Sequence, residues 1–196
     1  MNIIDVSHHD GIIDWAKVIT DPFKPVGVYI KATQGSTYVD PIFYSNATGA
    51  TNAKLQVGYY HFATLNTHDV STDAKAEATF FVNTIKKAPK ATLPLVLDIE
   101  VDDKLIKLTS AEVFNYIKTF FYTLEQYSYH DYAIYSYTSY LDSRLPKNHG
   151  LGNIKLWIAA YTPKLRLPQG WSKQWLWQYT DSGTIQGISS KVDLSK

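Results

Sequence analysis

The sequence has no cysteine, which excludes disulfide bonds and thiolate catalysis but does not fix the compartment in which the protein works. It also lacks any apolar run of membrane-spanning length, so we expect no association with a membrane. Residues 1–30 contain no basic segment followed by an apolar one, and we therefore find no recognisable signal peptide.

The chain has no large excess of either charge, since 19 basic residues balance 18 acidic ones and leave a formal net charge of +1. Nucleic-acid binding needs a clustered basic face, so we expect no nucleic-acid partner. Hydrophobic content of 45% and a length of 196 residues suit one globular domain that spans 1–196. Aromatic residues are plentiful, at 14% of the chain, and can fill a core or stack on sugar rings.

Apolar segments alternate with segments of helical periodicity in the first part of the chain. Eight segments are typical of strands: Asn2–Val6, Val26–Ala32, Val57–Phe62, Leu93–Glu100, Tyr132–Ser136, Lys155–Ala159, Trp175–Tyr179 and Lys191–Leu194. Helices are expected at Asp14–Ile19, at Ser71–Lys87, from Asp40 as N-cap and Pro41 toward Ala53, and after a capping box at Thr109–Glu112. This pattern predicts an α/β fold, a TIM-like β/α barrel of eight parallel strands whose helices are incomplete in the second half.

The segment from Leu93 to Glu100 is an apolar strand that ends in two carboxylates. Alternate residues of a strand share a face, so Asp98 and Glu100 lie together with Cα atoms about 6.6 Å apart. Burial and mutual repulsion should raise at least one pKa, which leaves an acid and a base in one site, as hydrolysis of a glycosidic bond requires. A lone Asp-x-Glu also fits a solvated strand end, and the other strands must decide between these interpretations.

The remaining strands favour a site, because active sites of such barrels lie at the C-terminal ends of the strands. Those ends carry Asp5, Lys31, Tyr60, Asp98, Glu100, Tyr135 and, on the last strand, Asp193. The first and last strands are neighbours in a closed barrel, so Asp5 and Asp193 should lie side by side. Four converging carboxylates destabilise a fold by burial and mutual repulsion, so we expect such a cluster only where function requires it.

Several short motifs occur in a characteristic order and spacing. They are Asp5-Val6-Ser7 with Gly11, Ile13-Asp14-Trp15, Ile30-Lys31-Ala32-Thr33 with Gly35, Tyr38-Val39-Asp40-Pro41, Gly58-Tyr59-Tyr60-His61-Phe62, Leu93 to Glu100, Leu156-Trp157-Ile158-Ala159, Trp177-Gln178-Tyr179-Thr180, Gly187-Ile188 and Val192-Asp193-Leu194. With these motifs the sequence resembles the Chalaropsis-type lysozymes, the muramidases of glycoside hydrolase family 25, along essentially its whole length.

The resemblance implies cleavage of the β-1,4 bond between N-acetylmuramic acid and N-acetylglucosamine in bacterial peptidoglycan. It implies that Glu100 is the general acid and that Asp98 orients the substrate's 2-acetamido group for a substrate-assisted attack. Asp5 and Asp193 complete the expected catalytic carboxylates. The substrate-binding residues that it implies are Lys31, Tyr60, Phe62, Tyr135 and Gln178. The Cα spacing does not decide between retention and inversion, so the stereochemical outcome stays open.

Three positions depart from the family pattern: Gln34 stands where Glu is common, Asp10 where Gln is common, and Ser195 where Asn is common. We expect no metal site at His8-His9, because adjacent histidines on a loop are usually exposed, and we expect no cofactor. His61 is interpreted as a packed, hydrogen-bonded residue or a substrate contact.

We therefore expect a peptidoglycan-cleaving lysozyme that is a monomer and acts at the bacterial cell wall. Without a recognised signal peptide, it resembles a phage endolysin catalytic domain that is released from the host cytoplasm at lysis. Two alternatives stay open, a catalytically inactive peptidoglycan-binding module and a glycosidase acting on chitin-like polymers. Chitinases with a similar fold carry a longer acidic motif, whereas Val96 and Leu97 precede Asp98 here.

Overall fold

A computed structural model describes residues 1–100 and 107–196. The strands are β1 (Ile3–Val6), β2 (Gly27–Gln34), β3 (Tyr38–Val39), β4 (Gln56–Phe62), β5 (Leu95–Asp98), β6 (Tyr132–Tyr137), β7 (Lys155–Ala159), β8 (Leu176–Gly183) and β9 (Val192–Ser195). The helices are η1 (His8–Asp10, a 3-10 turn), α1 (Trp15–Val18), α2 (Phe43–Asn52), α3 (Val70–Ile85), α4 (Ser110–Gln126) and α5 (Thr138–Arg144).

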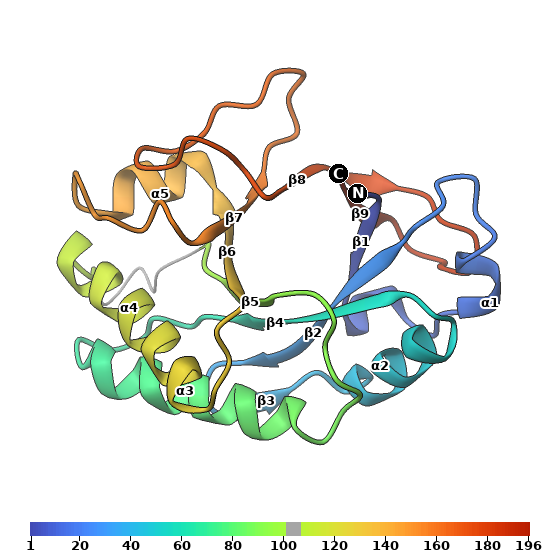
Figure 1. Cartoon of the computed structure of the whole chain (residues 1–196), viewed down its shortest axis with the longest axis horizontal. Coiled ribbons are helices and arrows are strands. Elements are labelled where there is room, and N and C mark those ends of the chain that lie inside the picture. Colours follow the sequence, from blue (N-terminus) through green and yellow to red (C-terminus); the bar gives the residue numbers. More distant parts are fainter. Residues whose placement is uncertain (101–106) are drawn as a thin grey trace.

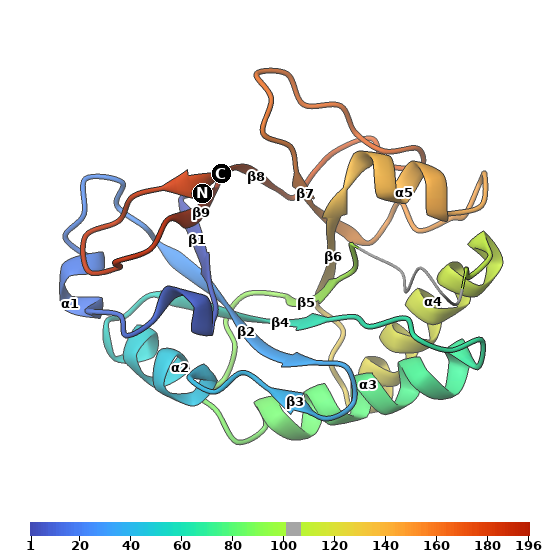
Figure 2. The ribbon, with the colours of Figure 1, turned by 180° about the vertical axis from the view of Figure 1, so that it is seen from behind.

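Eight strands close into a ring in the order β1-β2-β4-β5-β6-β7-β8-β9, and β9 returns to β1 (Figures 1 and 2). The short strand β3 is an addition to the ring and pairs with β2 alone among the described strands. The predicted eight-stranded β/α barrel is therefore confirmed. No helix within 1–100 or 107–196 combines the length and the apolar character needed to cross a bilayer.

The last strand of the ring runs in the opposite direction to the prediction. Among the described strands of the ring, the pairings from β1 to β8 are parallel, but β9 is antiparallel to both β8 and β1. The additional strand β3 is also antiparallel to β2. Asp193 is thus the second residue of its strand and does not lie at a C-terminal end. It reaches the predicted rim because the reversed strand begins there, a direction that alternation of apolar residues does not reveal.

The start of one helix was predicted wrongly, and one helix was missed. Asp40 and Pro41 do not open α2, which begins at Phe43 with Ile42 as its N-cap, because the Asp40 carboxylate is used by the backbone N–H groups of Ile42 and His8. The polar helix α5 was not predicted, since only Tyr140 and Leu141 of its residues are buried. By contrast, the capping box between Thr109 and Glu112 is confirmed at the start of α4.

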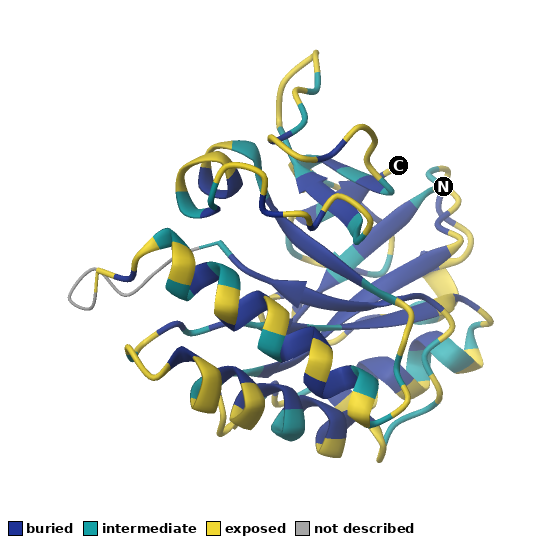
Figure 3. Cartoon of the chain, turned by 60° about the vertical axis from the view of Figure 1, so that its left-hand side comes forward, coloured by how far each residue is buried: buried dark blue, intermediate teal, exposed yellow. Residues whose placement is uncertain are grey.

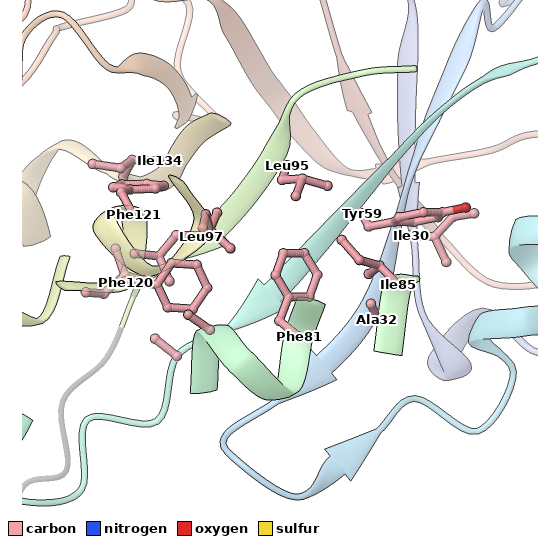
Figure 4. Close-up of a cluster of buried hydrophobic side chains, with 14 of the residues drawn as sticks. Ile30, Ala32, Tyr59, Phe81, Ile85, Leu95, Leu97, Phe120, Phe121 and Ile134 are labelled. Carbon is pink, nitrogen blue, oxygen red and sulfur yellow. The ribbon is translucent and has the colours of Figure 1, made fainter. Parts of the chain in front are cut away.

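Side chains of each strand alternate between the barrel interior and the helices. The interior holds a cluster of mainly large side chains: Ile3, Tyr29, Leu93, Val96, Ala133, Tyr135, Trp157 and Leu176. The opposite faces of the strands pack on the helices. Figure 4 shows Phe81 and Ile85 of α3 and Phe120 of α4 against strand residues that include Leu95 and Leu97. Figure 3 shows the result, buried strands with helices exposed only on their outer faces.

Candidate active site

The strand ends surround one pocket of about 280 Å³ at the mouth of the barrel. Its walls are formed by Asp5, Ser7, His9, Lys31, Tyr60, Phe62, Asp98, Glu100, Tyr135, Trp157 and Asp193. The structure therefore brings together all four predicted carboxylates and four of the five predicted substrate-binding residues. The fifth, Gln178, is buried beside the pocket and donates to Asp5.

Asp98 and Glu100 come from the end of β5. Their backbone is held on both sides, because the Asp98 carbonyl accepts from the Ala63 N–H at 2.9 Å and the Ile99 N–H donates to the Tyr135 carbonyl at 3.0 Å. Burial, followed by repulsion from Glu100, raises the pKa of Asp98 well above its usual range. Burial also raises the pKa of Glu100. The pair therefore holds a proton at a pH at which free carboxyls are ionised.

One oxygen of this pair has no hydrogen bond within the described structure. Asp98 is only 6% exposed, and its Oδ1 has no hydrogen-bond partner there. Leaving a buried acceptor unpaired costs about 1–3 kcal/mol. Such an atom in the wall of a pocket is suited to accept a donor from a bound molecule.

Asp5 and Asp193 form the opposite wall, where they are register partners across β1 and β9. Burial, together with repulsion from Asp193, raises the pKa of Asp5 well above its usual range. Burial raises the pKa of Asp193 to about 6. The Gln178 amide lies 3.1 Å from Asp5 Oδ2 and partly offsets the penalty for Asp5.

Lys31 supplies the positive charge among these acids. Burial lowers the pKa of its ammonium, and attraction to Asp98 opposes that effect. The ammonium donates to Gln34 Oε1 at 2.8 Å and lies 4.8 Å from the centre of the Phe62 ring. Gln34, one of the departures from the family pattern, therefore fixes Lys31 without neutralising it.

Aromatic side chains form the deeper walls of the pocket. Tyr135 donates through its hydroxyl to Gln178 Oε1 at 2.8 Å, and Trp157 donates to Ser195 Oγ at 3.0 Å. Ser195, a second departure, thus keeps a hydrogen-bonding role. Burial raises the pKa of Tyr60 well above its usual range, so Tyr60 presents a neutral hydroxyl.

Three other residues noted in the sequence can now be placed. His61 is fully buried on the helix side of β4, where it contacts Thr33 and Glu77, so it is a packed residue, as one of the two interpretations stated. His8 contacts Asp40 at 2.8 Å. In the described part of the chain, no three His, Cys, Asp or Glu side chains are arranged to hold a metal ion.

Ser7, His9 and Tyr161 were not predicted as site residues. Ser7 and His9 line the pocket from the turn after β1, and Tyr161 donates to Gln178 Oε1 at 2.7 Å from the loop after β7. The signal for Ser7 and His9 was their position directly after a strand that ends in a site carboxylate. Tyr161 lies in an irregular loop, for which sequence periodicity predicts no direction.

Comparison with known proteins gives a consistent result. The profile of the glycosyl hydrolases family 25 matches residues 4–188. Lysozyme M1 of Streptomyces globisporus is 31% identical over 203 residues, which cover 98% of this chain and 66% of that protein. The autolytic lysozyme of Clostridium acetobutylicum is 30% identical over 199 residues, with 100% and 55% covered. This chain thus spans less than two thirds of either relative.

A solved structure agrees over the full chain. The bacterial lysozyme from Streptomyces coelicolor superposes with a TM-score of 0.88 at 29% identity, and the match covers 100% of this chain and 91% of that one.

Proposed function

This chain belongs to the glycosyl hydrolases of family 25, and on that premise we propose that it is a lysozyme acting on bacterial peptidoglycan. The bond it hydrolyses is the β-1,4 linkage between N-acetylmuramic acid and N-acetylglucosamine. The two curated relatives, both named lysozymes, support this assignment. The family resemblance inferred from the motifs is confirmed, since the profile covers nearly the whole chain.

The observation that carries the proposal is the buried carboxyl pair at the end of β5. Glu100 lies two residues beyond the strand and is the more exposed member, so it faces an incoming sugar. Burial raises the pKa of Glu100, while its hydrogen bond with Asp98 works in the opposite direction, so the two carboxyls share a proton. Glu100 donates this proton to the glycosidic oxygen as the bond to the anomeric carbon breaks.

Asp98 acts on the substrate's 2-acetamido group. Its unpartnered Oδ1 accepts the acetamido N–H, which turns the acetamido carbonyl oxygen toward the anomeric carbon. Attack by that oxygen displaces the leaving sugar, and water then hydrolyses the cyclic intermediate with the Glu100 carboxylate as base. Because Asp98 is almost fully buried, little water competes for this contact with the acetamido group.

The other wall supports the charge that develops in this reaction. The transition state of glycoside hydrolysis resembles an oxocarbenium ion, and the negative charge of the Asp5–Asp193 pair stabilises it. Lys31 limits the repulsion within the acidic cluster. Tyr60, Phe62, Tyr135 and Gln178 bind and orient the sugar.

We further propose that the protein works as a monomer at the bacterial cell wall, and that it is released from a host cytoplasm during phage lysis. Size-exclusion chromatography tests the monomer. Recovery of the protein from the medium of intact cells would contradict release at lysis.

Digestion of purified peptidoglycan by the wild type and by Glu100→Gln tests the chemistry. After borohydride reduction, a muramidase yields muramitol, and the variant should lose at least a thousandfold in rate. Reduced glucosamine in the product would move the cleaved bond to the other linkage.

Two alternatives give different results in the same experiment. A peptidoglycan-binding module would be retained on insoluble peptidoglycan without releasing soluble fragments, and the intact Asp98 and Glu100 argue against it. A glycosidase for chitin-like polymers would release more sugar from chitin than from peptidoglycan.

A further inference from the structure

A second depression lies beside the active-site pocket and has no role in the chemistry described above. It is lined by residues 34–38 in the β2–β3 hairpin and by Thr64 and Asn66 in the connection from β4 to α3, and its volume is about 330 Å³. We call it the hairpin pocket. The hairpin and the β4–α3 connection lie on the same side of the barrel in Figure 2.

The hairpin pocket adjoins the carboxylate pocket through Gln34. The Gln34 side chain lines the hairpin pocket, and its Oε1 accepts from the Lys31 ammonium, which lines the carboxylate pocket. Phe62, on the other side of Lys31, also lines the carboxylate pocket. A polymer that lies across the carboxylates can therefore continue into the hairpin pocket.

The walls of the hairpin pocket are fixed before any ligand arrives. β3 pairs with the end of β2, and the Gly35 N–H donates to the Phe62 carbonyl at 3.1 Å. Gly35 has a φ of +57°, and a Cβ there would lie 3.2 Å from the Thr64 side chain, so the hairpin rests tightly on the opposite wall. A preformed site avoids the entropic cost of ordering its walls when a ligand binds.

The position of Tyr38 is fixed as well. Its hydroxyl oxygen lies 3.5 Å from His8 Nδ1, and the two rings meet edge to face with centroids 6.2 Å apart. Tyr38 nevertheless remains 38% exposed. An aromatic ring held at a fixed angle and partly open to solvent is suited to contact the apolar face of a sugar.

The chemistry of the lining selects the kind of ligand. The hairpin pocket offers the hydroxyl groups of Ser36 and Thr37, the Thr64 hydroxyl oxygen as an acceptor, the Gln34 amide N–H groups as donors and the Asn66 amide. No acid, lysine or arginine is among the residues that line it. A peptide with free carboxylates or an ammonium group would lose hydration there without gaining an ion pair. An uncharged sugar that carries hydroxyl and acetamido groups finds both donors and acceptors.

We propose that the hairpin pocket is a further sugar subsite that binds an N-acetylhexosamine of the glycan strand, beyond the two sugars that flank the cleaved bond. This assignment rests on the proposed action on peptidoglycan. Its consequence is that long strands bind more tightly than short fragments, with Tyr38 and Asn66 responsible for the difference.

Binding measured without turnover tests the subsite. In the Glu100→Gln background, β-1,4-linked oligomers of N-acetylglucosamine with two to six sugars are titrated by calorimetry. We expect affinity to rise with length, and Tyr38→Ala to weaken binding of the hexamer about tenfold while it changes binding of the dimer less than threefold. Asn66→Ala, on the opposite wall, should also weaken binding of the hexamer more than binding of the dimer. A loss in both variants would show that the effect of Tyr38→Ala is not a local distortion of the hairpin. Tyr122→Ala, at an exposed tyrosine of α4, is the control and should change neither value.

Equal losses for all lengths, or no loss for the hexamer, would overturn the subsite. Tighter binding of strands that carry stem peptides, lost in Tyr38→Ala, would replace the sugar by a peptide and would overturn it as well. The proposed function fails separately, because it depends on muramitol release by the wild type and not on these titrations.

Discussion

At the scale of single residues, the environment of each carboxyl group decides its task. Glu100 and Asp98 lie two residues apart and both line the pocket, yet Glu100 is partly exposed, while Asp98 is almost fully buried with an unpartnered oxygen. Asp5 and Asp193 face them with pKa values raised chiefly by burial. Lys31 is the only lysine or arginine among the pocket-lining residues, so its ammonium is the main counter-charge to the four carboxyl groups.

Replacing this charge should move the pH dependence of hydrolysis. The Lys31 ammonium lowers the pKa values of Asp98 and Glu100, so Lys31→Met should raise both. The acid form then persists to higher pH, and the basic limb of the kcat/KM profile should shift upward by about 1 unit. Lys31→Arg keeps the charge and is the control. An unchanged limb in Lys31→Met would show that Lys31 does not act on these carboxyls.

Asp193 should cost stability at neutral pH. Its folded-state pKa of about 6 lies above the usual 3.8, so its ionised form is penalised in the folded protein at pH 7, and the penalty disappears as the pH falls below both values. Because Asp193 is partly exposed, we expect Asp193→Asn to stabilise the protein by only about 1 kcal/mol at pH 7. Thermal unfolding should give a Tm about 2–4 °C higher at pH 7 and almost no difference at pH 3, below both pKa values. A lower Tm at pH 7 would contradict this account.

At the scale of elements, the helices position the strands through one buried polar network. Glu77 of α3 accepts from His61 of β4 and from Tyr116 of α4, each at 2.6 Å, and from Thr64. Burial alone would raise the pKa of Glu77, but these hydrogen bonds outweigh it and lower the pKa. The network thus fixes β4, and with it Tyr60 and Phe62, from outside the barrel.

Removing the acceptor at the centre of this network should destabilise the fold. Glu77→Ala leaves three donors without this acceptor, two of them fully buried, and we expect the free energy of unfolding to fall by about 3–5 kcal/mol. Urea unfolding at pH 7 measures the change, with Lys75→Ala on the exposed face of α3 as the control.

The sign of the pKa shift adds a second test of the Glu77 network. A lowered folded-state pKa means that this stabilisation is present above the usual 4.5 and is lost as the pH falls through the folded value. The difference between wild type and Glu77→Ala should therefore shrink in acid. A constant difference would mean that ionisation of Glu77 plays no part.

The elements also show why sequence patterns predicted much of this fold. The strands were located as short, largely apolar runs, since β2 and β5 are buried on both faces. Helices α3 and α4 have one clear apolar face, as at Phe81 and Phe120, so periodicity located them. α5 and the start of α2 were missed because tertiary contacts decide them. The Asp40 carboxylate is used by His8, 32 residues away in the sequence, and not by a helix that it opens.

At the scale of the whole molecule, the candidate site was predicted better than the direction of its last strand. Closure of a barrel brings the first and last strands together in either direction, so the contact between Asp5 and Asp193 followed from closure alone. The antiparallel course of β9 was not predictable, because strand periodicity is the same in both directions. The family resemblance assigned Gln178 to the substrate site. Alternation along β8 did not show whether its side chain faces the barrel interior or the outer side, and only the structure decided between them.

The seam of the barrel should tolerate a covalent join. Ile3 pairs with Ser195, and both chain ends lie together in Figure 1. A circular permutant with a short glycine-rich linker between the two ends, reopened in the exposed loop between Pro163 and Lys164, should keep its Tm within about 5 °C and release muramitol. A matched permutant reopened within β5 should not fold.

The position of β9 also has a consequence for the timing of activity. Its pairing with β1 joins residues from opposite ends of the sequence, and such distant contacts form slowly because the intervening chain must first be ordered. Until β9 is seated, the ring is open and Asp193 is absent from the wall that it shares with Asp5. A chain whose two ends have not yet met therefore has an open ring and lacks one of the four carboxylates of the pocket.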